Sequence, residues 1–135
     1  MSLLSSAHAD RAYVIGIAGY AVLYRRGTAS GKTTLCRKIK EQMKGDVAVL
    51  EFDNFYKDLP EGTNAQFWDF DHPTSTDFDS VLKCLTDLRE LKPAHTPVYS
   101  FVTNARVPGE SHTIEPRKIV ILEGIFALYD QVREC

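Results

Sequence analysis

Three short apolar runs along the chain have the pattern of buried β-strands. They are residues 13–18, 47–52 and 118–122. A continuous apolar run of this length is typical of a parallel strand whose two faces are both covered. Between the first two runs, apolar residues recur every four positions and predict a helix that Gly45 ends; they are Leu35, Ile39 and Met43. This order predicts a β-α-β unit within an α/β fold that has a parallel sheet.

A long stretch after the second run has little periodicity. Residues 53–80 are rich in aromatic, acidic and turn-forming residues, and aperiodic segments of this length are often binding loops. Helical spacing then resumes at Phe78, Val81, Leu82, Leu85, Leu88 and Leu91. Ser75 or Thr76 is expected to cap this helix, and Pro93 lies just beyond its end.

The last part of the chain predicts further strands and one more helix. Residues 96–114 favour strands on both sides of the turn-forming pair Pro108-Gly109, which predicts a hairpin or two short strands. After the third apolar run, residues 125–132 are expected to begin a helix.

The first apolar run leads to a segment, GTASGKT at residues 27–33, that ends like a phosphate-binding P-loop. Such a loop points backbone N–H groups at phosphate oxygens and leads into a helix N-terminus with a lysine and a hydroxyl for Mg²⁺. We therefore expect phosphate contacts from Gly27, Thr28, Ala29, Ser30, Gly31, Lys32, Thr33 and Thr34. The alternative, an ordinary helix start at GKTT, is disfavoured by the apolar strand upstream.

The loop departs from the P-loop template at one point, because Arg26 occupies the position of the first glycine. Omitting residues 20–26 would join Gly19 to Gly27 and give VIGIAGGTASGKTT, which fits the template at every position. The sequence therefore indicates a P-loop interrupted by a seven-residue insert.

Two of the predicted strands end in acidic residues, Asp53 and Glu123. Ligands bind at the carboxyl ends of the strands in an open α/β sheet, so both acids and the P-loop are expected to converge on one crevice. Glu123 follows IVIL like a Walker B acid and, with Thr33 and Asp53, forms our predicted Mg²⁺ site. Asp53 is the candidate base that accepts the proton of an acceptor hydroxyl, and Lys32 is expected to face the phosphates. The alternative for Asp53 is a turn-forming aspartate before Asn54.

An acceptor pocket needs aromatic faces and a few hydrogen-bonding groups. Residues of these types are Phe55, Tyr56, Phe70, Asp71, His72, Tyr99, Phe101, Asn104 and Arg106. For Phe70 and Phe101, a place in the hydrophobic core is an equally good interpretation.

Composition narrows the class of protein. The 135 residues are 44% hydrophobic with a net charge of -2 and no long run of like charge, which is typical of one soluble domain without a nucleic-acid-binding face. The three cysteines form no CxxC pair, so reduced thiols are expected. Residues 1–11 lack the apolar stretch of a signal or membrane segment. We therefore expect a cytoplasmic protein with no membrane or nucleic-acid partner.

Five segments together resemble the uridine/cytidine kinase family of P-loop kinases: GTASGKTT, DNFYKDL, DFDHP, PVYSFVTNAR and ILEGIFALYD. The resemblance covers about residues 13–131 and implies a three-layer P-loop NTPase-type fold with a mainly parallel sheet. It also implies transfer of the γ-phosphate of ATP, or of GTP, to the 5′-hydroxyl of uridine or cytidine in pyrimidine salvage, with Mg²⁺. Matching positions imply Lys32 and Thr33 at the phosphates and metal, Asp53 as the catalytic base and Glu123 near the metal. The positions around the nucleoside are Tyr56, Asp71, Tyr99, Phe101, Asn104 and Arg106.

Two further features depart from that family. Asn104 stands where members usually have a histidine that contacts the base, although an amide can also both donate and accept hydrogen bonds. The chain ends soon after Glu123, whereas the family continues with further strands and an arginine-bearing lid. Residues 1–12 are therefore expected to be a polar leader, and residues 13–135 the N-terminal part of a kinase domain truncated at its C-terminus.

Three functions stay open at this point. The first is a uridine/cytidine kinase active as written, as a homo-oligomer or with parts from a partner chain. The second is a catalytically deficient truncated or splice-variant product that at most binds nucleotides or a full-length kinase; the insert and the early end favour it. The third is another P-loop small-molecule kinase, such as a phosphoribulokinase or pantothenate kinase relative, which the DFDHP and PVYSF segments disfavour.

Overall fold

A sheet of three parallel strands lies at the centre of the structure, a computed structural model that describes residues 11–18, 31–129 and 132. Its strands are β1 (Tyr13–Ile17), β5 (Ile119–Glu123) and β2 (Val47–Glu51), in that order across the sheet. The helices are α1 (Lys32–Gln42) and α2 (Phe78–Arg89), and β3 (Ala94–Ser100) pairs with β4 (Ala105–Ile114) in a separate antiparallel sheet. The long loop before α2 contains the 3₁₀ helices η1 (Phe52–Phe55), η2 (Ala65–Phe67) and η3 (Pro73–Ser75).

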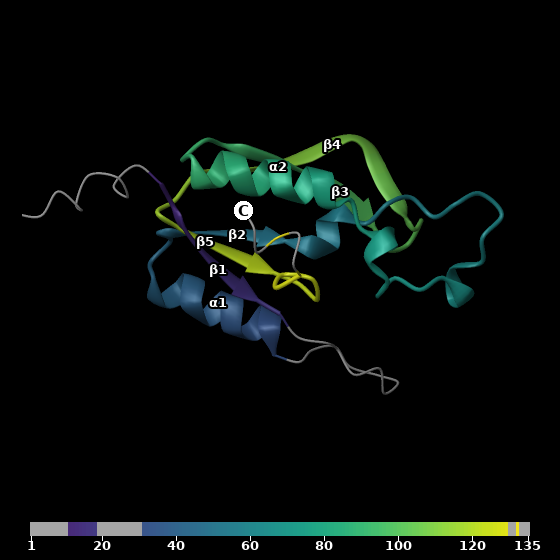
Figure 1. Ribbon diagram of the computed structural model, residues 1–135, viewed down its shortest axis with the longest axis horizontal. Coiled ribbons are helices and arrows are strands. Elements are labelled where there is room, and N and C mark those ends of the chain that lie inside the picture. Colours follow the sequence, from purple (N-terminus) through teal and green to yellow (C-terminus); the bar gives the residue numbers. More distant parts are fainter. Residues whose placement is uncertain (1–10, 19–30, 130–131, 133–135) are drawn as a thin grey trace, which may run out of the picture.

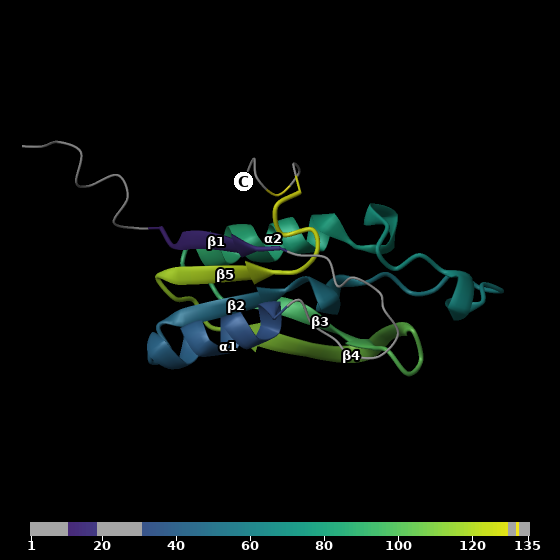
Figure 2. The ribbon, with the colours of Figure 1, turned by 90° about the horizontal axis from the view of Figure 1, so that it is seen from below.

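The two helices cover opposite faces of the parallel sheet, which gives the three layers of the predicted fold (Figures 1 and 2). Odd-numbered residues of β2 and β5 pack on the α1 side with Cys36; they are Val47, Val49, Ile119 and Ile121. Even-numbered residues pack in the larger core under α2; they are Ala48, Leu50, Val120 and Leu122. This alternation explains why the strands are continuous apolar runs, because each residue has a hydrophobic partner on one face or the other.

The strand β1 is less buried than its sequence predicted. It pairs with β5 on one side only and is an edge strand of the described sheet. The side chains of Tyr13, Val14 and Ile15 are 66%, 39% and 46% exposed. The prediction of a buried strand is wrong at these three residues, because an apolar run does not specify how many strands flank it.

The β3–β4 hairpin confirms the predicted antiparallel pair but turns at another place. Residues 101–104 form the turn, and Asn104 adopts a left-handed φ of 52°. Pro97 pairs with Ser111 whereas Tyr99 pairs with Arg106, so residues 107–110 bulge opposite a single residue of β3. Pro108-Gly109, the expected turn, forms this bulge, where a proline without an N–H breaks no regular ladder bond.

Two helix predictions also need correction. The N-cap of α2 is Asp77 rather than Ser75 or Thr76, because the Ser75 hydroxyl already donates to the carbonyls of Phe70 and His72. Of the expected helix at 125–132, residues 125–128 form successive turns, with Ala127 N donating to Gly124 O at 3.2 Å, whereas Val132 is helical and residues 130–131 lie outside the described part. Burial of Phe126 and Ala127 in the core draws this segment back under the sheet.

Candidate active site

The carboxyl ends of the three parallel strands meet at one edge of the sheet. Ile17, Glu123 and Glu51 are in register across β1, β5 and β2. The N–H of Gly124 donates to the carbonyl of Ile17 at 3.1 Å and ties the end of β5 to that of β1. In Figure 1 these ends lie on the same side of the molecule as the start of α1. A ligand at this edge is within reach of residues from all three strands.

The start of α1 is the described part of the predicted phosphate loop. Gly31 is its N-cap, and its left-handed φ of 76° is a conformation that glycine adopts without steric cost. Thr34 is exposed on the first turn. The other expected phosphate contacts, residues 27–30 and the side chains of Lys32 and Thr33, lie outside the described part of the structure, as do Gly19 and the insert at 20–26.

Asp53 lies two residues beyond the end of β2, on the 3₁₀ helix η1. Its neighbours Phe52 and Phe55 are buried, whereas Asp53 is exposed. The backbone of Gly124 packs so closely on Phe52 that a Cβ on Gly124 would collide with the Cβ of Phe52. This contact fixes the turn that carries Asp53 against the residue that follows Glu123.

Glu123 ends β5 and is only 8% exposed. Carboxylate and hydroxyl oxygens suit Mg²⁺, which needs only one or two protein carboxylates because it keeps several of its waters. Asp53, just beyond the end of β2, and Glu123, at the end of β5, carry carboxylates that could supply such ligands. Among the described residues there is no cluster of three or more histidine, cysteine or acidic side chains that could hold a more fully chelated metal.

Aromatic side chains of the long loop and the β3–β4 hairpin form a cluster that begins at Tyr56, the residue after η1, which carries Asp53. The ring of Tyr56 is 5.6 Å from Phe70, 5.5 Å from Tyr99 and 5.9 Å from Phe101, between ring centroids. Phe101 is 60% exposed, so its interpretation as a core residue is wrong. Phe55, proposed for the acceptor pocket, is instead fully buried in the core. Tyr56 and Tyr99 are themselves buried, so Phe101 is the ring through which the cluster presents aromatic surface to solvent.

Both tyrosines of the cluster are in unusual electrostatic surroundings. Burial raises the pKa of Tyr56, and the negative charges of Asp53 and Asp71 raise it further. Burial also raises the pKa of Tyr99, with a contribution from Asp58. Among the described residues, none forms a hydrogen bond with the buried hydroxyl of Tyr99. A buried hydroxyl of this kind costs free energy unless a partner satisfies it.

The remaining predicted nucleoside residues surround this cluster. Asp71 is exposed, and its charge acts on Tyr56. Asn104 accepts a hydrogen bond from Leu59 N at 3.1 Å through its backbone carbonyl. Arg106 donates from Nε to the Tyr56 carbonyl at 3.2 Å and from Nη2 to Asp77 at 2.9 Å. The structure therefore brings these residues together across about fifty positions of sequence.

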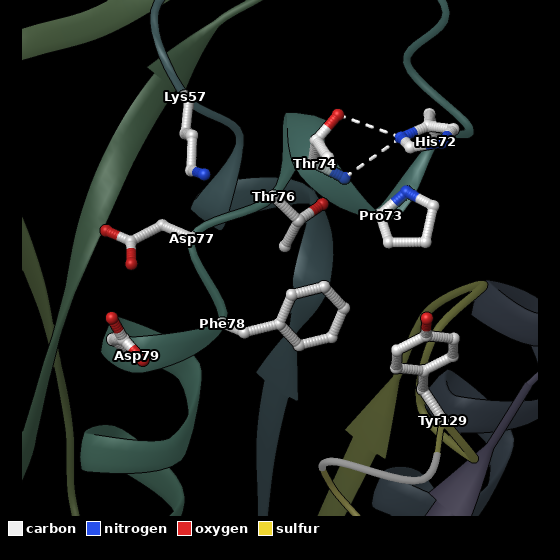
Figure 3. A pocket seen from close by; sticks show the side chains of 9 residues that line it. All are labelled: Lys57, His72, Pro73, Thr74, Thr76, Asp77, Phe78, Asp79 and Tyr129. Atoms are coloured by element: carbon white, nitrogen blue, oxygen red, sulfur yellow. Dashed lines mark hydrogen bonds between the residues drawn. The ribbon is translucent and has the colours of Figure 1, made fainter.

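A pocket of about 470 Å³ lies next to the cluster and includes residues that the sequence did not single out. Figure 3 shows its lining, in which the His72 ring accepts a hydrogen bond from Thr74 N and also bonds the Thr74 hydroxyl. The lining residues are Lys57, His72, Pro73, Thr74, Thr76, Asp77, Phe78, Asp79 and Tyr129. Only the turn and helix-cap chemistry around Asp77 could have indicated this pocket from sequence.

Comparison with known proteins agrees with this arrangement. A family described as "Phosphoribulokinase / Uridine kinase family" matches residues 14–134. The uridine kinase of Saccharomyces cerevisiae is 40% identical over 124 residues, covering 88% of this chain and 23% of that protein. Uridine-cytidine kinase 2-B of Danio rerio is 39% identical over 132 residues, covering 88% of this chain and 47% of that protein. The chain thus spans at most about half the length of these relatives.

Solved structures with the same fold are also kinases by name. One described as a possible uridine kinase from Bacillus stearothermophilus has a TM-score of 0.67 at 20% identity, covering 97% of this chain and 70% of that one. A D-glycerate 3-kinase from Cryptococcus neoformans has a TM-score of 0.58 at 22% identity, covering 86% and 43%. At such identities these structures support the fold alone. The family match over nearly the whole chain confirms the resemblance inferred from the motifs, and the chain belongs to the phosphoribulokinase/uridine kinase family.

Proposed function

We propose that the chain acts as a nucleoside kinase, transferring the γ-phosphate of ATP, or of GTP, to the 5′-hydroxyl of uridine or cytidine. The observation that carries the proposal is that Asp53 lies on η1 and that Tyr56, whose ring packs against Tyr99 and Phe101, is the C-cap of the same 3₁₀ helix. Relatives named as uridine or uridine-cytidine kinases support the substrate class. A cytoplasmic role in pyrimidine salvage, by the chain alone or as a homo-oligomer, belongs to the same proposal.

Each part of the site has a role in this reaction. The exposed ring of Phe101, which packs on Tyr56 and Tyr99, would offer a face for a pyrimidine. Asp53 accepts the proton of the 5′-hydroxyl as that oxygen attacks the γ-phosphorus, the bond from this phosphorus to the β,γ-bridging oxygen breaks, and ADP or GDP leaves; Lys32 would face the phosphates. Bound Mg²⁺ would neutralise charge on the transferred phosphoryl group; Thr33, Asp53 and Glu123 would hold it.

The test is the change Asp53→Asn, made in a variant that lacks residues 20–26 so that the P-loop fits its template. We expect uridine phosphorylation to fall on the order of 100- to 10,000-fold, because a positioned base is lost. ATP affinity should stay nearly unchanged. Phosphorylation would be followed by conversion of labelled uridine to UMP, and ATP binding by calorimetry. Near-parental turnover would exclude Asp53 as the base.

A second candidate function is a catalytically deficient chain that binds nucleotides or another kinase chain. The exposed apolar residues of the edge strand β1 favour it, because such an edge can pair with another chain. Uridine phosphorylation by the chain as written would support the first candidate. ATP or uridine binding without phosphorylation would support the second.

A further inference from the structure

Arg106 is held by three residues, from two segments of the chain that lie far from it in sequence. Its backbone N–H donates to Asp58 Oδ1 at 2.8 Å. Its Nε donates to the carbonyl of Tyr56 at 3.2 Å, and its Nη2 donates to Asp77 Oδ2 at 2.9 Å. Two nitrogens of the guanidinium therefore already donate hydrogen bonds to acceptors within the protein itself.

Asp77 is a well-fixed anchor for this guanidinium. It is the N-cap of α2, where Oδ1 accepts from Ser80 N at 3.2 Å and Oδ2 accepts from Ser80 Oγ at 2.7 Å. Its own N–H donates to the carbonyl of Phe55 at 2.8 Å. Burial alone would raise the pKa of Asp77, but the hydrogen bonds from Ser80 and Arg106 outweigh it and lower that pKa. The carboxylate thus stays charged and in place at neutral pH.

The bond to Tyr56 connects this anchor to the aromatic cluster. Tyr56 also forms an isolated β-bridge with Thr76, next to Asp77. Its ring packs against Tyr99 of β3, while Arg106 is the second residue of the paired strand β4 and is in register with Tyr99. A single guanidinium therefore joins the loop that carries one tyrosine, the hairpin that carries the other, and the start of α2.

We propose that Arg106 and Asp77 form a latch that positions Tyr56 and Tyr99 for the nucleoside base, and that Arg106 acts through these residues rather than by touching the nucleoside. The inference rests on the proposed function and replaces direct substrate contact as the role of Arg106. An arginine is required because its planar fork presents two N–H groups in different directions, one to a carbonyl and one to a carboxylate. A lysine would supply the charge without this geometry.

The test is a double-mutant cycle of Arg106→Gln and Asp77→Asn in the chain as it exists, with uridine and ATP affinities measured by calorimetry. Asparagine still caps a helix well, so Asp77→Asn removes the charge while keeping the start of α2. We expect each change to weaken uridine binding about tenfold, and the double variant to lose no more than either single one, because both remove the same latch. ATP affinity should change less than about twofold.

The matched control is Lys83→Gln, which removes an exposed ion pair with Asp87 from α2 without touching the latch. It should leave uridine affinity unchanged. Loss of uridine affinity in Arg106→Gln but not in Asp77→Asn would mean direct contact with the nucleoside and would overturn the proposal. Additive losses, or no loss in either variant, would overturn it as well.

Near-ultraviolet circular dichroism provides a readout that does not depend on the substrate. Arg106→Gln and Asp77→Asn should weaken the tyrosine signal to the same extent, whereas Lys83→Gln should leave it unchanged. An unchanged signal in both latch variants would overturn the proposal. A parent chain that binds no uridine would instead count against the proposed function, and this signal would then decide the latch alone. Far-ultraviolet spectra first establish that each variant is folded. If Arg106→Gln is unfolded, Arg106→Lys takes its place, because it should also lose the hydrogen bond to the Tyr56 carbonyl.

Discussion

At the scale of single residues, Asp77 combines helix capping and ion pairing in one carboxylate. Its folded-state pKa lies below the ordinary value of 3.8, although burial opposes this shift, because Ser80 and Arg106 donate hydrogen bonds to it. A group whose pKa is lower in the folded state stabilises the fold above its unfolded pKa and loses this contribution as pH falls through the folded pKa.

The chain should therefore lose part of its stability to acid through Asp77. We expect Asp77→Asn to lower the free energy of unfolding by about 1 kcal/mol at pH 7, because the pair is partly exposed to solvent. The difference should shrink below about pH 4 and vanish once the carboxyl is protonated in both states. Urea unfolding of both chains from pH 7 to pH 2.5 measures it. A difference that persists undiminished at the lowest pH would show that the charge of Asp77 is not what stabilises the fold.

Which site residues could be predicted depended on how local their signals are. Asp53 and Glu123 follow apolar runs directly, so the sequence reveals that Glu123 ends a strand and that Asp53 comes just beyond one, although the short 3₁₀ helix that carries Asp53 was not predicted. The pair Arg106–Asp77 joins positions 29 residues apart, and no local pattern reveals it. The sequence could not identify the N-cap of α2 either, because each of three successive residues, Ser75, Thr76 and Asp77, is of a type that can cap a helix. Only the folded loop shows that the Ser75 hydroxyl is engaged with other carbonyls.

At the scale of elements, the position of β5 relative to η1 depends on Gly124. A Cβ at this position would collide with the backbone-proximal atoms of Phe52, which cannot rotate away as the end of a long side chain could. Gly124→Ala should therefore separate the turn that carries Asp53 from the end of β5. We expect a loss of about 2–4 kcal/mol in the free energy of unfolding, measured by urea.

Gly109→Ala is the matched control for this prediction. Gly124 and Gly109 both have a positive φ, 156° and 75°, but a Cβ on Gly109 would meet no atom within 4 Å in the described part of the chain. Its replacement should cost only about 1 kcal/mol, the usual penalty for a left-handed alanine. Equal losses in the two variants would mean that backbone conformation, not the contact with Phe52, explains the cost at Gly124.

The hairpin shows the limit of turn signals within an element. Pro-Gly is a strong turn former, and the sequence on both sides of it favours strands, yet the chain turns at residues 101–104. The pairing of β3 with β4 extends across Pro108-Gly109 by means of a bulge. Contacts of Tyr99 with Tyr56 and Phe101 favour this register, which a local pattern cannot specify.

At the scale of the whole molecule, the layers were predictable whereas the strand order was not. Continuous apolar strands separated by amphipathic helices require a sheet covered on both faces, as observed. The order β1-β5-β2 places a strand from near the end of the described chain between the first two, and only long-range pairing decides this. No helix of the described residues is long and apolar enough to cross a membrane.

The predicted interruption of the P-loop bears on the whole molecule, because we expect ATP binding to depend on it. The sequence puts Arg26 where the template needs a glycine, and a side chain there would point at the space for the phosphates. The positive charge suits phosphate, so the objection is geometric. We expect the chain as written to bind ATP at least about tenfold more weakly than a variant lacking residues 20–26, a difference of roughly 1.4 kcal/mol.

Calorimetric titration of both proteins with ATP and Mg²⁺ tests this prediction, once circular dichroism shows that both are folded. Uridine affinity is the internal control, because Tyr56, Tyr99 and the latch that positions them come from other segments than the loop, so uridine should bind alike to both proteins. Weaker ATP binding with equal uridine binding would locate the defect in the phosphate loop and favour the catalytically deficient chain. Equal ATP affinities would mean that the insert leaves the loop able to close around phosphates, and a kinase active as written would then be the better proposal.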